Sequence, residues 1–125
     1  MNIPDNFQVI DHALIHHKLS LIRDKNTGSK EFRELVTEAT ILLAYEATKI
    51  LSLKDAEVQT PITTAQVKTV DVTDIVLVPV LRAGLDMVEG MLKLIPNARV
   101  GYVGMERDHE THQPVDYYFK IPNHA

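Results

Sequence analysis

One short stretch combines residue types that are suited to binding an anion. Seven apolar residues, Ile75 to Leu81, are followed directly by Arg82, Ala83 and Gly84. A guanidinium group presents paired donors that match phosphate oxygens, and small residues let a ligand approach the backbone. If a strand ends here and a helix begins, the positive end of the helix dipole points at the same place. The stretch therefore predicts a phosphate or pyrophosphate site.

The same arginine has a purely structural alternative. Arg82 could pair with Asp86 or Glu89 at the start of the following helix, and these two carboxylates count against an anion nearby. The stretch lacks the lysine and the outer glycine of a P-loop, and it does not match the G-x-G-x-x-G pattern. On residue types alone both interpretations stay open.

A second arginine, Arg107, comes shortly after the next predicted strand, residues 99–104. Ligands of open α/β sheets sit outside the carboxyl ends of the strands, and parallel neighbouring strands end at the same edge. We therefore expect Arg107 at the same edge as Arg82, where two cations make a stronger anion site than one. The alternative is a solvated charge within the charged loop 105–115.

The remaining polar residues match no catalytic or metal-binding motif. His12 and His16 stand four residues apart on a predicted helix, but the glutamate of H-E-x-x-H and a third ligand are missing. His109 and His112 fall in the charged loop, where they could close over a ligand or simply be exposed. There is no cysteine and no Ser-His-Asp arrangement, so we assign no acid/base residue, no nucleophile and no metal ligand.

Two helices are predicted before any strand. Residues 12–23 place apolar residues near helical spacing, with Asp11 as the expected cap. After turn residues 24–28, a long helix is expected from about Ser29, its N-cap, to Leu53. Its predicted core-facing stripe consists of Phe32, Leu35, Val36, Ala39, Leu42, Leu43, Ala47 and Ile50.

The rest of the chain predicts strands around one helix. Residues 56–70 alternate β-branched and polar residues, which indicates a hairpin with Pro61 at its edge or turn. Such a hairpin is either an arm against another subunit or a solvated hairpin. Downstream, the expected elements are a buried strand at 75–80, a helix at 84–95, a strand at 99–104 and a last strand at 116–121. The strand, helix and strand in this series predict a parallel βαβ unit with a right-handed crossover.

Length and composition restrict the class of protein. The 125 residues correspond to one domain, and 45% hydrophobic with 24% charged residues is ordinary for a globular chain. The net charge of −4 argues against bulk attraction to nucleic acid or to an anionic membrane. No signal peptide is evident, the longest apolar runs are too short to span a bilayer, and no cysteine is present. We expect a cytoplasmic protein.

Several segments together resemble uracil phosphoribosyltransferase. They are HALIHHKLSLIRD, in which Ala13 stands where the family has proline, KEFRELV with LLAYEAT, VLVPVLRAGLDMVEGML, and ARVGYVGMERDHETHQPVDYYFKIP. They cover nearly the whole chain in the family's order. The resemblance implies an α/β fold, specifically the N-terminal part of a type I phosphoribosyltransferase fold, with two N-terminal helices, a β-hairpin arm, a parallel βαβ core and a flap hairpin.

The resemblance also implies an activity and a set of substrates. Uracil and phosphoribosyl pyrophosphate would give UMP and pyrophosphate in pyrimidine salvage, with magnesium accompanying the donor. Arg82, with the backbone of Ala83 and Gly84, would hold pyrophosphate, and Arg107 would be a second donor contact. The hairpin from Glu106 to Tyr117 would be a mobile flap. Some family members respond to GTP, for which Arg23 and Arg33 are conceivable contacts, and a homodimer or higher homo-oligomer is the family expectation.

Two functional segments of the family do not occur in these 125 residues. They are the ribose-phosphate loop with its Thr-Gly-Gly run and the uracil-binding Pro-Gly-Leu-Gly-Asp segment. We therefore expect residues 1–125 to be a single truncated domain that is inactive alone and that depends on a partner or aggregates. Two alternatives remain: a non-catalytic oligomerisation module, or a phosphoribosyltransferase for another base.

Overall fold

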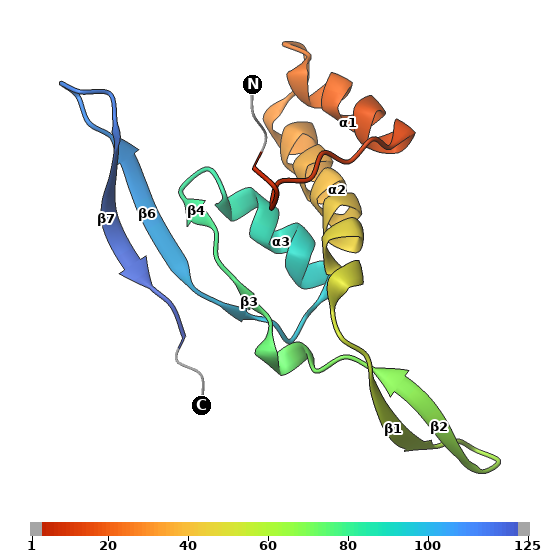
Figure 1. The fold of residues 1–125 in the computed structure, drawn as a ribbon. Helices are drawn as coiled ribbons and strands as arrows, with labels where there is room; N and C mark the ends of the chain where they lie inside the picture. Colours follow the sequence, from red (N-terminus) through yellow and green to blue (C-terminus); the bar gives the residue numbers. More distant parts are fainter. Residues whose placement is uncertain (1–3, 123–125) are drawn as a thin grey trace.

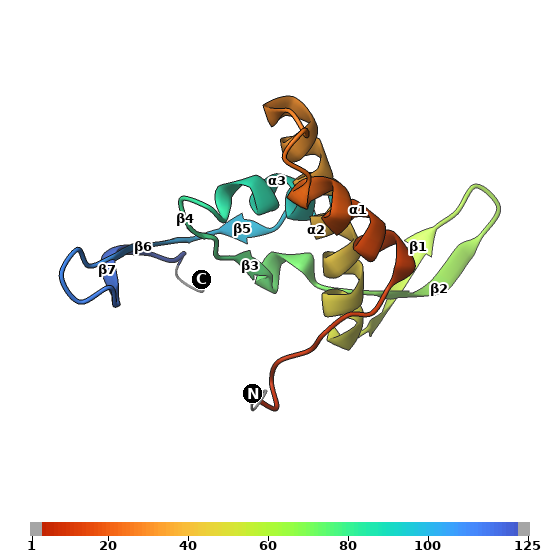
Figure 2. The same ribbon diagram turned by 90° about the horizontal axis from the view of Figure 1, so that it is seen from above.

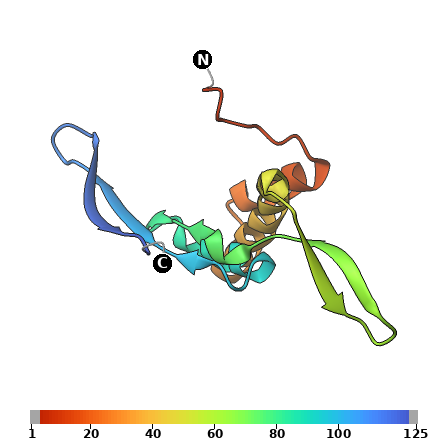
Figure 3. The ribbon, with the colours of Figure 1, turned by 60° about the horizontal axis from the view of Figure 1, so that its bottom comes forward.

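The computed structural model describes residues 4–122 and shows a helical layer beside short strands, with a hairpin projecting at each end (Figures 1 and 3). The element order confirms the α/β class and the βαβ core. Within the described residues, no helix combines the length and the apolar character needed to cross a membrane.

Helix α1 (Ala13–Arg23) begins one residue later than predicted and has a different cap. The Nδ1 atom of His12 accepts a hydrogen bond from the Leu14 N–H at 3.1 Å. Asp11, the expected cap, instead bonds Nε2 of His16 at 2.7 Å. The prediction for Asp11 is wrong because the histidine next to the helix satisfies the free N–H first.

Helix α2 (Ser29–Ala47) starts at the predicted residue, but Gly28 is its N-cap and no side chain caps it. The prediction that Ser29 is the cap is therefore wrong by one position. The predicted apolar stripe is only partly buried, since Phe32 is 39% and Ile50 84% exposed. The buried residues are mostly small: Leu35, Thr37, Ala39, Thr40 and Ala44.

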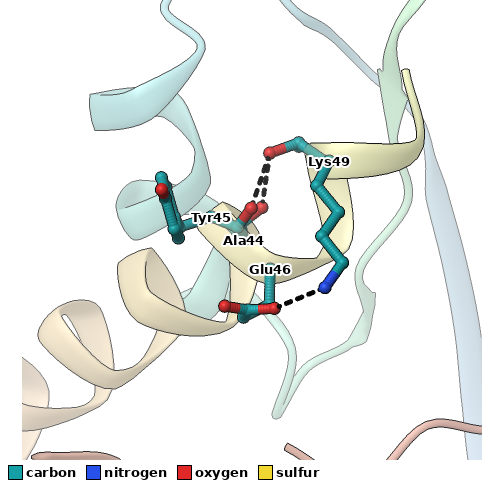
Figure 4. A network of polar contacts seen from close by, with 5 residues as sticks. Ala44, Tyr45, Glu46 and Lys49 are labelled. Carbon is teal, nitrogen blue, oxygen red and sulfur yellow. Dashed lines mark hydrogen bonds and ion pairs between the residues drawn. The ribbon is translucent and has the colours of Figure 1, made fainter. Parts of the chain in front are cut away.

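Helix α2 ends at Ala47, well before the predicted end at Leu53, and a single 3-10 turn, η1 (Thr48–Ile50), follows it. The Thr48 hydroxyl donates to the carbonyls of Ala44 at 2.7 Å and Tyr45 at 3.2 Å, and Lys49 pairs with Glu46 at 3.2 Å (Figure 4). The Thr48 hydroxyl thus adds side-chain hydrogen bonds to carbonyls of the last helical turn, and the Thr48 backbone N–H donates to Ala44 and Glu46 as well. The chain can then leave the helix in extended form.

Strands β1 (Lys54–Gln59) and β2 (Thr64–Thr69) form the predicted hairpin, here called the arm. They pair antiparallel over six residue pairs, and Pro61 lies in the turn. The arm extends away from the helices (Figures 1 and 3). Its base is tied by an ion pair of Lys54 with Asp71 at 3.6 Å, next to the 3-10 turn η2 (Val72–Asp74).

The predicted strand at 75–80 is divided into β3 (Val76–Leu77) and β4 (Val80–Leu81). Pro79 lies in the break because it has no N–H to donate to a ladder. β3 pairs parallel with β5 (Arg99–Val100), and β4 pairs parallel with β6 (Tyr102–Arg107). Helix α3 (Leu85–Leu94) connects β4 to β5 and lies over one face of these strands (Figure 2).

The last two strands differ from the predicted boundaries. β6 continues through Arg107, and β7 is Pro114–Lys120, so the expected loop 105–115 shortens to 108–113. Because β6 pairs antiparallel with β7, the charged residues Glu106 and Arg107 belong to a strand and not to a loop. The two strands form the flap hairpin, with a register shift between Gly104 and Met105.

Helices α2 and α3 meet at a glycine. A Cβ on Gly90 would lie 2.7 Å from the Thr37 carbonyl oxygen and 2.9 Å from the Thr40 Cβ. Both threonines are buried, and the Thr40 hydroxyl donates back to the Val36 carbonyl at 2.7 Å. The backbones therefore approach more closely than any larger residue would allow.

Replacing Gly90 with alanine should lower the free energy of unfolding. Alanine gains about 1 kcal/mol of helix propensity, but overpacking against a backbone oxygen costs about 1–3 kcal/mol, so we expect a net loss of up to about 2 kcal/mol. Urea unfolding monitored by circular dichroism measures it. The control is Gly28→Ser, where a Cβ meets nothing within 4 Å and serine suits the N-cap position. Equal midpoints for the two variants would contradict this account of the helix contact.

Candidate functional site

The Arg82–Gly84 loop is a tight connection between β4 and α3. The Gly84 N–H donates to the Val80 carbonyl at 2.9 Å, and the Leu85 N–H donates to the Arg82 carbonyl at 3.1 Å. A Cβ on Gly84 would lie 2.9 Å from both N and O of Val80. The Leu81–Arg82 peptide bond is cis. Only glycine lets the chain turn this closely from strand into helix.

Some backbone N–H groups of the loop are used within the protein, and others are left available to a ligand. The Gly84 N–H is used by Val80, whereas the N–H groups of Ala83 and Asp86 donate to no backbone acceptor in the described part of the chain. These two groups lie at the N-terminal end of α3, where the helix dipole favours negative charge. Ala83 is exposed and leaves the approach open.

The Arg82 side chain is exposed and, within residues 4–122, forms no ion pair or side-chain hydrogen bond. The structural alternative, pairing with Asp86 or Glu89, is therefore not realised. A guanidinium group beside free N–H groups and a helix N-terminus can bind a phosphate group through several charge-assisted hydrogen bonds.

Arg107 ends β6 at the predicted sheet edge. Leu81 pairs with Gly104, so Arg107 stands three residues beyond the level at which β4 ends. At about 3.3 Å per residue, this puts its backbone roughly 10 Å further out along the strand. β6 can be followed past β4 into the flap hairpin in Figure 1. Arg107 lines a cleft with Met105, Glu106, His112 and Pro114, and Arg82 is not among the residues of that cleft.

The turn of the flap hairpin is organised by Asp108. Its Oδ1 atom accepts hydrogen bonds from the Thr111 N–H at 2.9 Å and the Glu110 N–H at 2.8 Å. These two backbone hydrogen bonds, that of Thr111 first, hold the pKa of the Asp108 carboxyl below its usual value. The Asp108 backbone also bonds Gln113 and His112, each at 2.9 Å. The turn is thus defined by its own hydrogen bonds.

The structure brings together one pair that the sequence did not connect. Arg107 and His112 line a cleft of about 230 Å³, together with Met105, Glu106 and Pro114. His112 has a positive φ of 58°, which histidine tolerates better than most residues. The turn composition of residues 108–112 is the one signal in the sequence that could have indicated this placement.

The other candidate residues lie elsewhere. Arg33 lines a cleft of about 510 Å³ between α2 and α3, whereas Arg23, in the last turn of α1, does not. His12 caps α1 and His16 bonds Asp11. Residues 4–122 contain no group of three histidine, aspartate or glutamate side chains that could hold a metal ion.

Comparison with known proteins gives a consistent result. A family model described as uracil phosphoribosyltransferase matches residues 9–125. A uracil phosphoribosyltransferase of Thermoanaerobacter sp. (strain X514) is 58% identical over 118 residues, which are 94% of this chain and 56% of that protein. The Listeria welshimeri uracil phosphoribosyltransferase is 53% identical over the same shares. The chain thus spans about half the length of the curated relatives it matches.

A solved structure is also similar. The AQ2163 protein from Aquifex aeolicus superposes with a TM-score of 0.86 at 38% identity, over 90% of this chain and 54% of that chain. This agreement covers the arrangement of helices and strands described above.

The Asp108 turn should depend on pH in the acid range. Because the pKa of Asp108 is lower in the folded chain than the ordinary 3.8, its stabilisation of the turn is complete above 3.8 and is lost as pH falls through the folded-state value. Asp108→Ala should remove that dependence and speed amide exchange at Glu110 and Thr111, as measured by NMR. Asp116→Ala, in the same hairpin, is the control. Unchanged exchange in Asp108→Ala would contradict the assignment.

Proposed function

The chain belongs to the uracil phosphoribosyltransferase family, and we propose that it carries the pyrophosphate-binding part of an enzyme that joins uracil to phosphoribosyl pyrophosphate, giving UMP and pyrophosphate. The observation that supports this most is the Arg82–Gly84 loop, with its unpaired guanidinium at a helix N-terminus. The names of the relatives favour uracil over another base.

In the proposed reaction, a uracil ring nitrogen gives up its proton to solvent and bonds to the anomeric carbon of the ribose, while the bond from that carbon to the pyrophosphate oxygen breaks. Negative charge therefore grows on the leaving group. Arg82 and the N–H groups of Ala83 and Asp86 would stabilise that charge, and fixed donors of this kind can contribute about 2.7–4 kcal/mol each. Arg107 would approach the donor when the flap hairpin closes, which would also exclude water.

Magnesium enters this proposal through the donor. It neutralises charge on phosphate oxygens when bound, and it commonly uses substrate phosphates with only one or two carboxylates. The loop itself offers cationic and N–H donors, which suit the phosphate oxygens and not the metal. We therefore assign no residue of this chain as a magnesium ligand.

Sequence and structure give less support to regulation by GTP. Arg33 shares its cleft with Lys30 and Lys93, but also with three carboxylates, those of Glu34, Glu38 and Glu89. A triphosphate there would meet as many negative as positive groups, and Arg23 lies outside the cleft. We therefore leave GTP out of the proposal.

We assign the proposed activity to the cytoplasm, in keeping with the lack of cysteine in these 125 residues.

A second function is favoured by the arm. Within the described part of the chain the arm makes no extensive packing with any other element. Ala56 pairs with Val67 and Val58 with Ala65, which places four apolar residues on one face, and Ile62 at the turn is 95% exposed. The opposite face is polar and cross-linked, for example by Gln66 and Glu57 at 2.6 Å. We propose that the apolar face packs against a second copy in a homo-oligomer, with or without catalysis.

The pyrophosphate proposal can be tested directly on this chain. Arg82→Ala and Arg107→Ala should each weaken binding of magnesium pyrophosphate about 10-fold or more, because hydrogen bonds to charged groups contribute about 1.5–3 kcal/mol. Isothermal titration calorimetry measures the affinity, and Arg33→Ala is the control. We also expect no UMP from this chain alone. Binding unchanged by both variants would favour the interaction module, and UMP formation would contradict the expectation of inactivity.

The arm proposal has a separate test. Val58→Ser and Ile62→Ser should shift the chain from dimer or higher oligomer toward monomer, since each removes apolar area from the proposed contact. Sedimentation velocity across a range of concentrations gives the mass. Gln66→Ala, on the polar face of the same hairpin, should leave the mass unchanged. A mass that none of the three variants alters would rule out the arm as the contact.

A further inference from the structure

The cleft in the flap hairpin has the composition of a small anion site. Arg107 supplies a guanidinium and His112 an imidazole, and both side chains are exposed to solvent. Met105 and Pro114 provide apolar walls. Neither Arg107 nor His112 forms an ion pair or a side-chain hydrogen bond within residues 4–122. Two donors that face one cleft are therefore available to a ligand.

The position of His112 is fixed by the turn and does not depend on the imidazole. Its N–H donates to the Asp108 carbonyl at 2.9 Å, and its backbone has a φ of 58°. The next residue, Gln113, accepts from the Asp108 N–H at 2.9 Å. Pro114 then pairs with Arg107 across the ladder. The turn thus returns the chain so that residue 112 lies beside residue 107.

The charges around the imidazole have both signs. Glu106 and Arg107 share the cleft from β6, and Asp108, His109 and Glu110 stand in the same turn. Asp108 is occupied by two backbone N–H groups, which reduces its demand for a cation. Glu106 forms no ion pair with Arg107 in the described residues. Protonation of His112 would therefore give the cleft a net positive charge.

We propose that His112 is a second anion-binding residue of the flap hairpin and grips the pyrophosphate end of the donor together with Arg107. This inference rests on the proposed phosphoribosyl transfer. A guanidinium is a permanent cation, and an imidazole adds a second donor that carries a positive charge when protonated. The two groups could therefore hold an anion from two sides of the cleft.

The test compares variants that keep the backbone of the turn. His112→Asn tolerates a positive φ and never becomes cationic, and His112→Gly removes the side chain where glycine is comfortable. His109→Asn is the control, because His109 lies in the same turn but does not line the cleft. Magnesium pyrophosphate binding is measured by calorimetry at pH 6 and pH 8.5. Because pyrophosphate itself titrates, the quantity compared is the ratio of affinities of parent and variant at each pH.

We expect both His112 variants to weaken binding about 5- to 10-fold at pH 6 and about 2-fold or less at pH 8.5. His109→Asn should give a ratio near one at both values. If Arg107→Ala weakens binding while both His112 variants match the parent at pH 6, this inference is overturned and the proposed function stands. If the parent binds no pyrophosphate at either pH, or if neither Arg82→Ala nor Arg107→Ala matters, both proposals fail.

Discussion

The turn from β4 into α3 is the contact on which the rest of this structure depends. The Val80 carbonyl accepts the Gly84 N–H at 2.9 Å, and the space between them excludes a Cβ. This contact decides where α3 begins and therefore which of its residues faces α2. Six residues after Gly84, Gly90 lies against α2, where an added Cβ would come within 2.7 Å of Thr37 and 2.9 Å of Thr40. The two glycines thus fix α3 at both of its contacts, and the position of Arg82 follows.

Away from this centre, the described residues leave much apolar surface exposed. Val80, Val103 and Phe119 pair in register across β4, β6 and β7, and Phe119 is 73% exposed. Parallel sheets are usually covered on both faces, and here α3 covers one. An isolated two-stranded hairpin is only marginally stable in water, which applies to the arm. The buried apolar residues of the described chain accordingly lie mostly in α1 and α2, namely Ile15, Leu35, Ala39 and Ala44, with Leu77 in β3 and Ile95 just after α3.

Sequence patterns predicted the elements better than their ends. The helices, the arm and the parallel βαβ order followed from periodicity and turn residues. The caps at Asp11 and Ser29 were wrong because neighbouring residues, His12 and Gly28, occupy the N-cap positions. The continuation of β6 through Arg107 depends on pairing with β7, which is a long-range contact that no local pattern contains. The break at Pro79 could have been predicted from its missing N–H.

In the candidate site too, local sequence patterns indicated the residues, whereas their contacts became visible only in the structure. Arg82 and Ala83 were identified from types and spacing, but the use of the Gly84 N–H by Val80 required the structure. The two arginines also differ in their support. Arg82 lies in the turn that leads into α3, whereas Arg107 lies on a hairpin about 10 Å further out along the strand direction. In the proposed function, a donor that contacted both arginines would draw the hairpin inward, and part of its binding energy would go into ordering the flap. Only a ligand long enough to reach both arginines gains the second contact that offsets this cost, which favours a pyrophosphate over a single phosphate.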